Sequence, residues 1–121
     1  RLQRRSTRHL SKKFPGSILE NIVFSELHRC FINRGMPAKI FHLRSKEKVE
    51  VDFLVELPNQ MYVALEAKLT PTDFTSKQQN LLGSLKLNLV EKFVITPSHS
   101  PRLANASCIQ VGEIWGIFDK F

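Results

Sequence analysis

Three charged residues in the middle of the chain have the types and spacing of a metal-dependent phosphodiesterase site. Asp52 lies in one alternating segment, and Glu66 and Lys68 lie in the next. Adjacent carboxylates repel each other unless a cation lies between them, and Mg²⁺ is typically held by one or two carboxylates, with water and substrate phosphate completing its shell. A neighbouring lysine can hold the attacking water or neutralise charge in the transition state. The trio predicts phosphodiester hydrolysis, with Asp52, Glu66 and Lys68 as the catalytic residues.

Two alternating segments must position this trio. Residues 49–56 and 61–69 each alternate in the manner of half-buried β-strands. A loop at 58–60 brings both apolar sets to one face of an antiparallel hairpin, whereas a loop one residue shorter would mix the faces. The resulting register pairs Leu57 with Met61, Val55 with Val63, Phe53 with Leu65, Val51 with Ala67, Asp52 with Glu66 and Glu50 with Lys68. The same pattern also fits a solvated polar face with a Glu50–Lys68 salt bridge.

A helix ahead of the hairpin contributes a third carboxylate. Gly16 and Ser17 predict its start, with Ser17 as the N-cap, and apolar residues then recur at helical spacing up to Phe31. Glu20 points about 30° from the centre of that apolar stripe and so faces the sheet. Burying a carboxylate is costly unless it is paired or binds a metal. Glu20 is therefore a candidate for binding a metal or pairing with Lys68 across the helix–sheet interface, and the alternative is a capping-box partner of Ser17.

The remaining elements follow from the same periodicities and complete an α/β fold. In chain order they are a strand at 38–43, a helix capped by Thr72 or Asp73 that runs to about Leu89, a strand at 91–96, a loop at 97–106, a last strand at 107–111 and a short aromatic-rich ending at 113–121. The order α-β-β-β-α-β, followed by this tail, predicts a central mixed sheet flanked by helices.

Composition indicates one globular domain with a basic arm. The 121 residues carry a net charge of +7, and residues 1–13 hold six basic residues and no acid, so the body is almost neutral. We expect 1–13 to be a linker or arm and 14–121 to be the domain. The arm suits nucleic-acid phosphates or simple solvation equally well. Its candidate nucleic-acid-binding residues are Arg4, Arg5, Arg8, Lys12 and Lys13.

Other features of the sequence concern location and weaker site candidates. No apolar run approaches the roughly 18 residues of a membrane span, and Cys30 reads as a buried free thiol, so we expect a cytoplasmic protein without a membrane. Three residues are weaker site candidates: Glu50, Gln78 and Gln79. Either glutamine could reach a metal-bound water or a phosphate. No Ser-His-Asp arrangement or glycine-rich phosphate loop is present.

The string of motifs resembles the PD-(D/E)XK nuclease superfamily. Asp52 followed by Glu66-Ala67-Lys68 matches its bipartite signature. The wider string of residues 16–23, Glu26-Leu27 and residues 50–53 is similar to the nuclease-like domain at the C-terminus of archaeal and bacterial AAA-type ATPases. The likeness covers residues 14–96, and Val51 stands where the motif name has Pro.

The resemblance carries its own expectations about fold, ligands and partners. It implies a restriction-endonuclease-like core and a Mg²⁺ or Mn²⁺ ion held by Asp52, Glu66, Glu20 and the Ala67 carbonyl, with Lys68 as the catalytic lysine. The implied partners are a nucleic acid, with DNA as the expected substrate, and the ATPase domain of a longer parent chain. A homo-oligomer is also compatible with the fold.

Two functions follow from these features. In the first, the domain is a Mg²⁺- or Mn²⁺-dependent nuclease. In the second, it is a non-catalytic binding or regulatory module of an AAA-type ATPase, in which the charged residues form a structural network. The complete set of Glu20, Asp52, Glu66 and Lys68 favours the nuclease, and the nearly neutral body favours the module.

Overall fold

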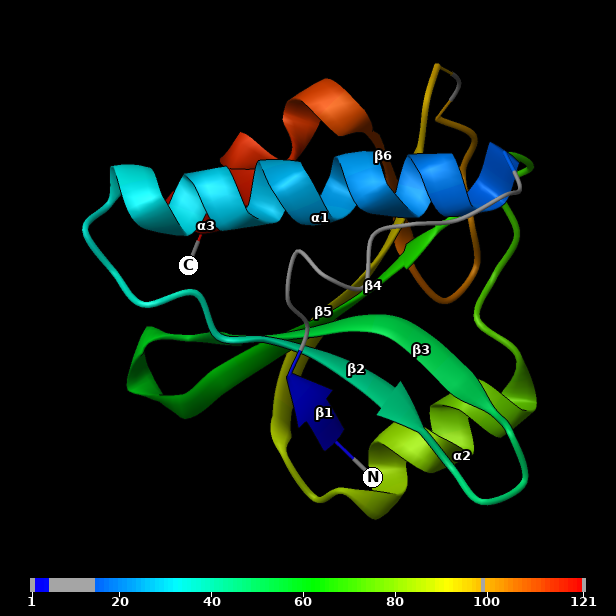
Figure 1. Ribbon diagram of the computed structural model, residues 1–121. Helices are drawn as coiled ribbons and strands as arrows, with labels where there is room; N and C mark the ends of the chain where they lie inside the picture. The colour runs from blue at the N-terminus through cyan, green and yellow to red at the C-terminus, as the bar shows by residue number, and fades with distance from the viewer. Residues whose placement is uncertain (1, 5–14, 99, 121) are drawn as a thin grey trace.

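The computed structural model describes residues 2–4, 15–98 and 100–120 of the chain. Within them, a six-stranded mixed sheet lies between helices (Figure 1). Strand order across the sheet follows the chain, β1-β2-β3-β4-β5-β6. The elements are β1 (Leu2–Arg4), α1 (Pro15–Asn33), β2 (Ile40–Arg44), β3 (Glu50–Leu57), β4 (Met61–Ala67), α2 (Ser76–Ser84), β5 (Asn88–Thr96), β6 (Ser107–Gln110) and α3 (Trp115–Lys120), with 3₁₀ turns η2 (Pro58–Gln60) and η3 (Val111–Glu113).

The sheet combines antiparallel and parallel pairing. Strands β1 to β4 pair antiparallel, and β4–β5 and β5–β6 pair parallel. Helix α2 connects the parallel pair β4 and β5, as a crossover between parallel strands requires. The predicted α/β class, with a mixed sheet flanked by helices, is confirmed.

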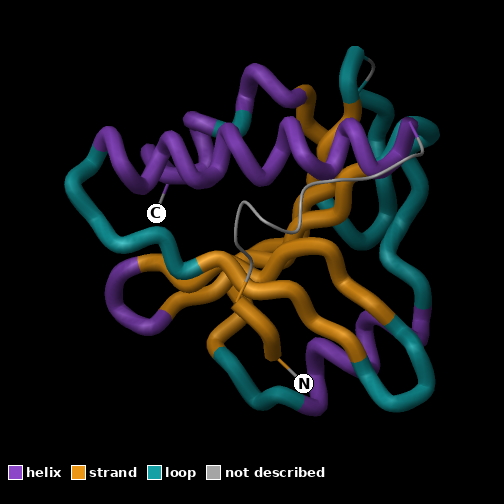
Figure 2. Tube along the Cα trace, in the orientation of Figure 1, coloured by secondary structure: helices purple, strands orange, loops and turns teal. Residues whose placement is uncertain are grey.

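Helices bury both faces of the sheet. Figure 2 shows α1 and α3 on one side of the strands and α2 on the other. On the first side, fully buried Val23 and Leu27 of α1 pack with Phe53 and Leu65 of the sheet. On the second side, Leu82 of α2 packs in a separate cluster, whose other buried members are Leu43, Val51, Leu54, Ala64, Phe74 and Val94. The hairpin face that the sequence assigns to polar residues is therefore largely covered by α2.

Both predicted helices have different ends in the structure. Helix α1 begins at Pro15, so Ser17 lies inside it rather than at the N-cap, and Glu20 is not at the capping-box position. Proline suits the first helical turn because its missing N–H has no partner there. Helix α2 is capped by Thr75, not by Thr72 or Asp73.

The C-terminal end of α2 also differs, because the helix stops at Ser84 and not near Leu89. Lys86 has a left-handed φ of 54°, which turns the chain out of the helix. The strand that follows, β5, therefore starts at Asn88, three residues earlier than residue 91.

Part of the predicted basic arm belongs to the sheet. Leu2–Arg4 form β1, which pairs with β2 through Leu2↔Leu43, Gln3↔His42 and Arg4↔Phe41. Alternating Leu and Gln permit this extended segment, so three residues of the predicted linker or arm form a strand. Arg5, Arg8, Lys12 and Lys13 lie outside the described residues.

The hairpin register is confirmed as far as Phe53↔Leu65, and η2 forms the predicted three-residue connection. Beyond that pair the strict alternation is wrong. Strand β2 pairs Phe41 with Leu54 and Leu43 with Val51, so the single residue His42 faces two residues of β3. This is a β-bulge, which shifts the side-chain alternation by one.

The bulge changes which face of the sheet Val51 occupies. Val51 joins the α2-side cluster together with Leu54, rather than the α1-side cluster of Phe53. The predicted pairing of Val51 with Ala67 is therefore absent from the β3–β4 ladder. The two bulged residues are Asp52 and Phe53, so this irregularity lies at the candidate site.

The structure also bears on the two cysteines and on the length of the apolar helices. Cys30 is buried and reduced, as predicted, and burial raises the pKa of its thiol to about 11. Cys108 is a half-buried free thiol. Among the described helices, none combines the length and apolar character needed to cross a bilayer.

Candidate functional site

Asp52 and Glu66 meet where the β3–β4 ladder ends. The last ladder pair is Phe53↔Leu65, and beyond it side chains replace backbone pairing. Oδ2 of Asp52 accepts a hydrogen bond from the Ala67 amide at 2.9 Å, and Oε1 of Glu66 accepts one from the Asp52 amide at 3.4 Å. Asp52 and Glu66 therefore meet as predicted, but not as a ladder pair. Their carboxylates occupy the space between the two strands and bond the backbone amides there.

Glu20 reaches the same space from α1. Its carboxyl is hydrogen bonded to that of Asp52 and adds its charge to the site. The bulge makes this contact possible, because it moves Asp52 to the side of Phe53, which faces α1. The prediction that Glu20 faces the sheet is confirmed.

Burial raises the pKa values of both Asp52 and Glu66. Burial, followed by the charge of Glu66 and hydrogen bonds to Glu66 and Glu20, raises the pKa of Asp52 well above its usual value. Burial also raises the pKa of Glu66, against the opposing influences of the Asp52 hydrogen bond and the Lys68 charge. Two carboxyl groups in contact and shielded from water do not both ionise readily.

Gln78 holds Glu66 from the other side of the sheet. Its Nε2 donates to Oε1 of Glu66 at 2.7 Å and to the Glu50 carbonyl at 2.9 Å. Its Oε1 accepts from the Thr75 amide, and Thr75 Oγ1 accepts from the Gln78 amide, which completes a capping box at the start of α2. The sequence Thr75-Ser-Lys-Gln78 is the usual signature of this motif. Of the weaker candidates, Gln78 is thus brought directly into the site.

Replacement of Gln78 by leucine should lower the free energy of unfolding by about 1–2 kcal/mol, since a helix cap and a hydrogen bond to a carboxylate are both lost. Gln79→Leu is the matched control, because Gln79 accepts one bond from Lys92 at 3.2 Å and does not touch Glu66. Urea unfolding followed by circular dichroism measures both variants. Equal destabilisation by the two would contradict this role of Gln78.

Lys68 lies beside the carboxylates, on the loop after β4. Its Nζ donates to Thr72 Oγ1 at 2.7 Å and approaches the Asp73 carbonyl at 3.5 Å. Its charge also lowers the pKa of Glu66 from the value that burial alone would produce. The Lys68 side chain is half-buried and is held by the Thr72 hydroxyl. The ion-pair partners of Glu50 are His42 and Arg44 instead of Lys68.

Glu50 and Gln79 are directed away from the pair. The exposed Glu50 carboxylate contacts His42 Nε2 at 3.1 Å and Arg44 Nε at 4.0 Å, which differs from the predicted pairing of Glu50 with Lys68. Gln79 contacts Lys92. The role of the Ala67 carbonyl as a metal ligand stays a prediction.

Sequence reasoning missed two contributors to the site. His42 faces the bulge, with Nδ1 3.4 Å from the Asp52 carbonyl. Asp73 clamps the loop that holds Lys68, since its Oδ1 accepts from the amides of Ala104 and Asn105 at 2.8 and 2.9 Å. The only sequence signal for Asp73 is that acidic side chains frequently bond backbone amides in turns.

The donor set fits a hard divalent cation. Asp52 and Glu66 present carboxylate oxygens beside each other, with Glu20 next to Asp52, and a bound cation would favour the charged forms that burial disfavours. Across residues 2–4, 15–98 and 100–120, no three His, Cys, Asp or Glu side chains have the arrangement of a preformed metal centre. Two carboxylates with water and substrate phosphate are nevertheless a usual shell for Mg²⁺.

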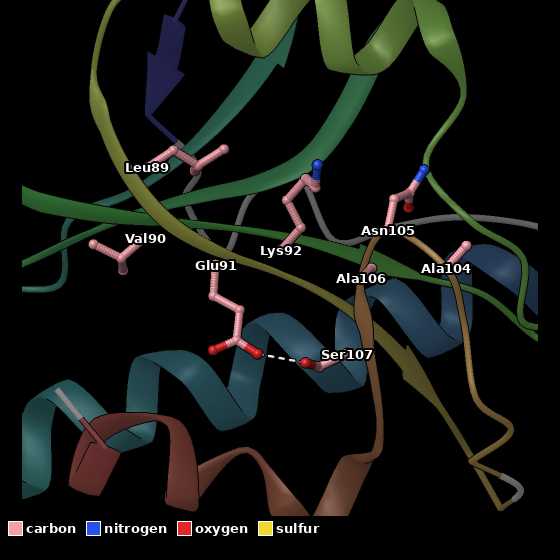
Figure 3. Close-up of a pocket in the computed structure, with 8 residues that line it drawn as sticks. All are labelled: Leu89, Val90, Glu91, Lys92, Ala104, Asn105, Ala106 and Ser107. Carbon is pink, nitrogen blue, oxygen red and sulfur yellow. Dashed lines mark hydrogen bonds between the residues drawn. The ribbon is translucent and has the colours of Figure 1, made fainter.

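The described cavities lie elsewhere. One, of about 430 Å³, is lined by β5 residues 89–92 and by residues 104–107 (Figure 3). In that view Glu91 and Lys92 project to opposite sides of β5, and Glu91 accepts a hydrogen bond from Ser107. The carboxylate cluster is therefore separate from this cavity.

Comparison with known proteins yields one finding. A family model described as "Domain of unknown function (DUF4143)" matches residues 15–114. No match was found among curated proteins or among solved structures.

Proposed function

The chain belongs to the family described as a domain of unknown function, DUF4143, and because that description names no activity, we propose from the site itself that the domain is a metal-dependent nuclease of the PD-(D/E)XK type. The proposed reaction is hydrolysis of phosphodiester bonds in nucleic acid. The contact between the half-buried carboxyl of Asp52 and the buried carboxyl of Glu66, beside Lys68, carries this proposal.

The physical reason is that a stable fold gains little from such a contact. Shielding these two carboxyl groups from water raises both pKa values and opposes folding at neutral pH. A functional site commonly contains groups perturbed in this way. The carboxylates, a nearby lysine and a positioned glutamine together match the needs of phosphodiester hydrolysis.

Asp52, Glu66 and Glu20 would hold a Mg²⁺ or Mn²⁺ ion. When bound, the ion supplies Lewis-acid stabilisation of phosphoryl charge and lowers the pKa of a bound water. Gln78 orients the Glu66 carboxylate through the 2.7 Å hydrogen bond. Lys68, anchored by Thr72, presents a positive charge toward the place where the phosphoryl oxygens gain negative charge.

The experiment that tests the proposal measures metal binding and cleavage on one preparation. Titration calorimetry with Mn²⁺ should show submillimolar binding, and labelled DNA and RNA should be cleaved with Mn²⁺ but not with EDTA. Lys68→Met keeps the carboxylates and the length of the side chain but removes the charge. It should retain Mn²⁺ binding and lose roughly 10²–10³-fold in cleavage rate.

The alternative is the non-catalytic module of an ATPase. Its specific support is that Asp52 and Glu66 bond to the Ala67 amide and to Gln78, as members of a structural network also would. Absence of Mn²⁺ binding at millimolar metal, with the chain folded, would favour that function and contradict the nuclease.

A further inference from the structure

The cations of the domain are distributed unevenly between the two sides of the sheet. On the α1 and α3 side, lysines and arginines form ion pairs, such as Arg29–Glu26, Arg34–Asp119 and Lys120–Glu91. On the α2 side and its loops, five cations besides Lys68 form no ion pair with an acid in the described part of the chain. They are Lys46, Lys48, Lys77, Lys86 and Lys92, and we call them the α2-side cations.

The α2-side cations are placed by the fold. Lys46 and Lys48 are exposed on the β2–β3 turn, and Lys77 is exposed in the first turn of α2. Figure 1 shows this turn and the start of α2 at the same end of the molecule. The two are joined directly, because Gln78 donates to the Glu50 carbonyl at the first residue of β3.

Strand β5 shows how the segregation of charge arises. Glu91 points to the α3 side and pairs with Lys120, whereas Lys92 points to the α2 side, contacts Gln79 and lies over the Phe74 ring at 5.9 Å. Figure 3 shows the two side chains on opposite sides of the strand. Alternation along one strand thus sends the acid to one face and the cation to the other.

Acids on the α2 side offset these cations only in part. Glu50 already pairs with His42 and Arg44, and Asp73 accepts from two backbone amides. Glu47, exposed between Lys46 and Lys48, is the remaining acid on the β2–β3 turn. The nearly neutral charge of the body therefore conceals a cationic surface next to the carboxylate site.

We propose that the α2-side cations bind the phosphate backbone of a double-stranded nucleic acid and direct it to the carboxylate site. The choice of a nucleic acid as the partner rests on the proposed function. Unpaired surface cations bind a polyanion through release of its counterions. Lys77 directly precedes Gln78, which bonds Glu66, and Lys46 and Lys48 lie on the turn before Glu50, whose carbonyl Gln78 also bonds.

The absence of a stacking platform favours a duplex over a single strand. Proteins that bind single strands usually combine a basic groove with exposed aromatic side chains on which the bases stack. Among the described residues, the exposed large hydrophobic side chains are all aliphatic: Ile18, Ile22, Ile32, Leu69 and Val90. A surface of cations without exposed aromatic side chains contacts the backbone, which a duplex presents continuously.

The test is a binding titration without metal, so that cleavage does not interfere. Fluorescence anisotropy of a labelled 20-base-pair DNA duplex in EDTA compares wild type with Lys46→Ala/Lys77→Ala. The matched control is Arg29→Ala/Lys39→Ala, which removes the same charge from exposed cations that are paired with Glu26 and Glu56 elsewhere on the fold.

We expect the Lys46/Lys77 double variant to weaken duplex binding by about tenfold. It should also reduce the slope of log K against log salt by nearly two, because about 0.9 counterions are released per phosphate contact. The control should change affinity less than twofold. Thermal unfolding confirms that both variants fold.

Several results would overturn the inference. They are equal losses in the two double variants, no duplex binding by wild type, tighter binding of a single strand of the same length, or preferential binding to vesicles of anionic phospholipid. The binding titration contains no metal and is independent of cleavage. Duplex binding as expected, together with no cleavage in the separate Mn²⁺ assay, would therefore reject only the proposed nuclease.

Discussion

Asp52→Asn is expected to abolish hydrolysis and, at the same time, to make the metal-free domain more stable at neutral pH. Asparagine has the shape of aspartate, so its oxygen can still accept from the Ala67 amide, while its amide donates to Glu66 or Glu20 without needing a proton. The charge that a cation would neutralise is gone. Loss of several kcal/mol of transition-state stabilisation corresponds to roughly a thousandfold or more in rate.

The gain in stability follows from the raised pKa of Asp52. A carboxyl whose pKa is raised by folding is stabilising only in its protonated form. Its contribution to the free energy of unfolding is complete below the usual pKa of 3.8. That contribution declines as pH rises toward the higher pKa of the folded state. Asparagine does not titrate, so the variant lacks this decline and should be more stable at pH 7 by on the order of 1 kcal/mol.

Three measurements check this prediction. Guanidinium unfolding from pH 4 to pH 8 without metal should show a flatter pH profile for the variant than for wild type. Mn²⁺ should raise the melting temperature of wild type and leave that of the variant unchanged. A variant that is less stable than wild type at pH 7, or that still gains stability from Mn²⁺, would be inconsistent with a charge-strained metal site.

Phe53→Ala is expected to cost about 3–5 kcal/mol in the free energy of unfolding, the usual range for removing a buried aromatic side chain. Phe53 is fully buried and stacks on Phe24 of α1, with ring centroids 6.5 Å apart. It is also the bulge residue adjacent to Asp52. The cavity would therefore open between α1 and the sheet, directly beside the carboxylates.

Phe53→Leu separates packing from site geometry. Leucine retains much of the volume, so its cost should be clearly smaller than that of alanine, and Mn²⁺ binding should persist. Urea unfolding measures the difference between the two variants. A cost below about 1 kcal/mol for Phe53→Ala would mean that Phe53 does not anchor α1 to the sheet at the bulge.

Patterns within the sequence were sufficient for much of the site. Two alternating strands joined by a three-residue loop placed Glu66 close to Asp52, because a register that buries one apolar face allows few alternatives. The position of Glu20 within an apolar helical stripe placed it toward the sheet, where it meets Asp52. These inferences use only neighbours along the chain or a local pair of strands.

Other features could not be read from the sequence because they depend on strands and loops that are distant along the chain. The contact of His42 with the bulge comes from β2, and the Asp73 clamp joins loops about thirty residues apart, from position 73 to positions 104 and 105. The segregation of cations depends on which face of β5 each helix covers. None of these arises from local periodicity.

The sequence by itself determined the α/β class, the hairpin register up to Phe53 and the set of charged residues that converge. Only the tertiary structure decided how Asp52 is presented, because the bulge opposite His42 moves it to the α1 side while Glu66 is held from the α2 side by Gln78. The physical reason is that alternation follows from backbone geometry within one strand. A bulge arises from packing between strands, where Val51 gains burial under α2 and Asp52 is brought to Glu20.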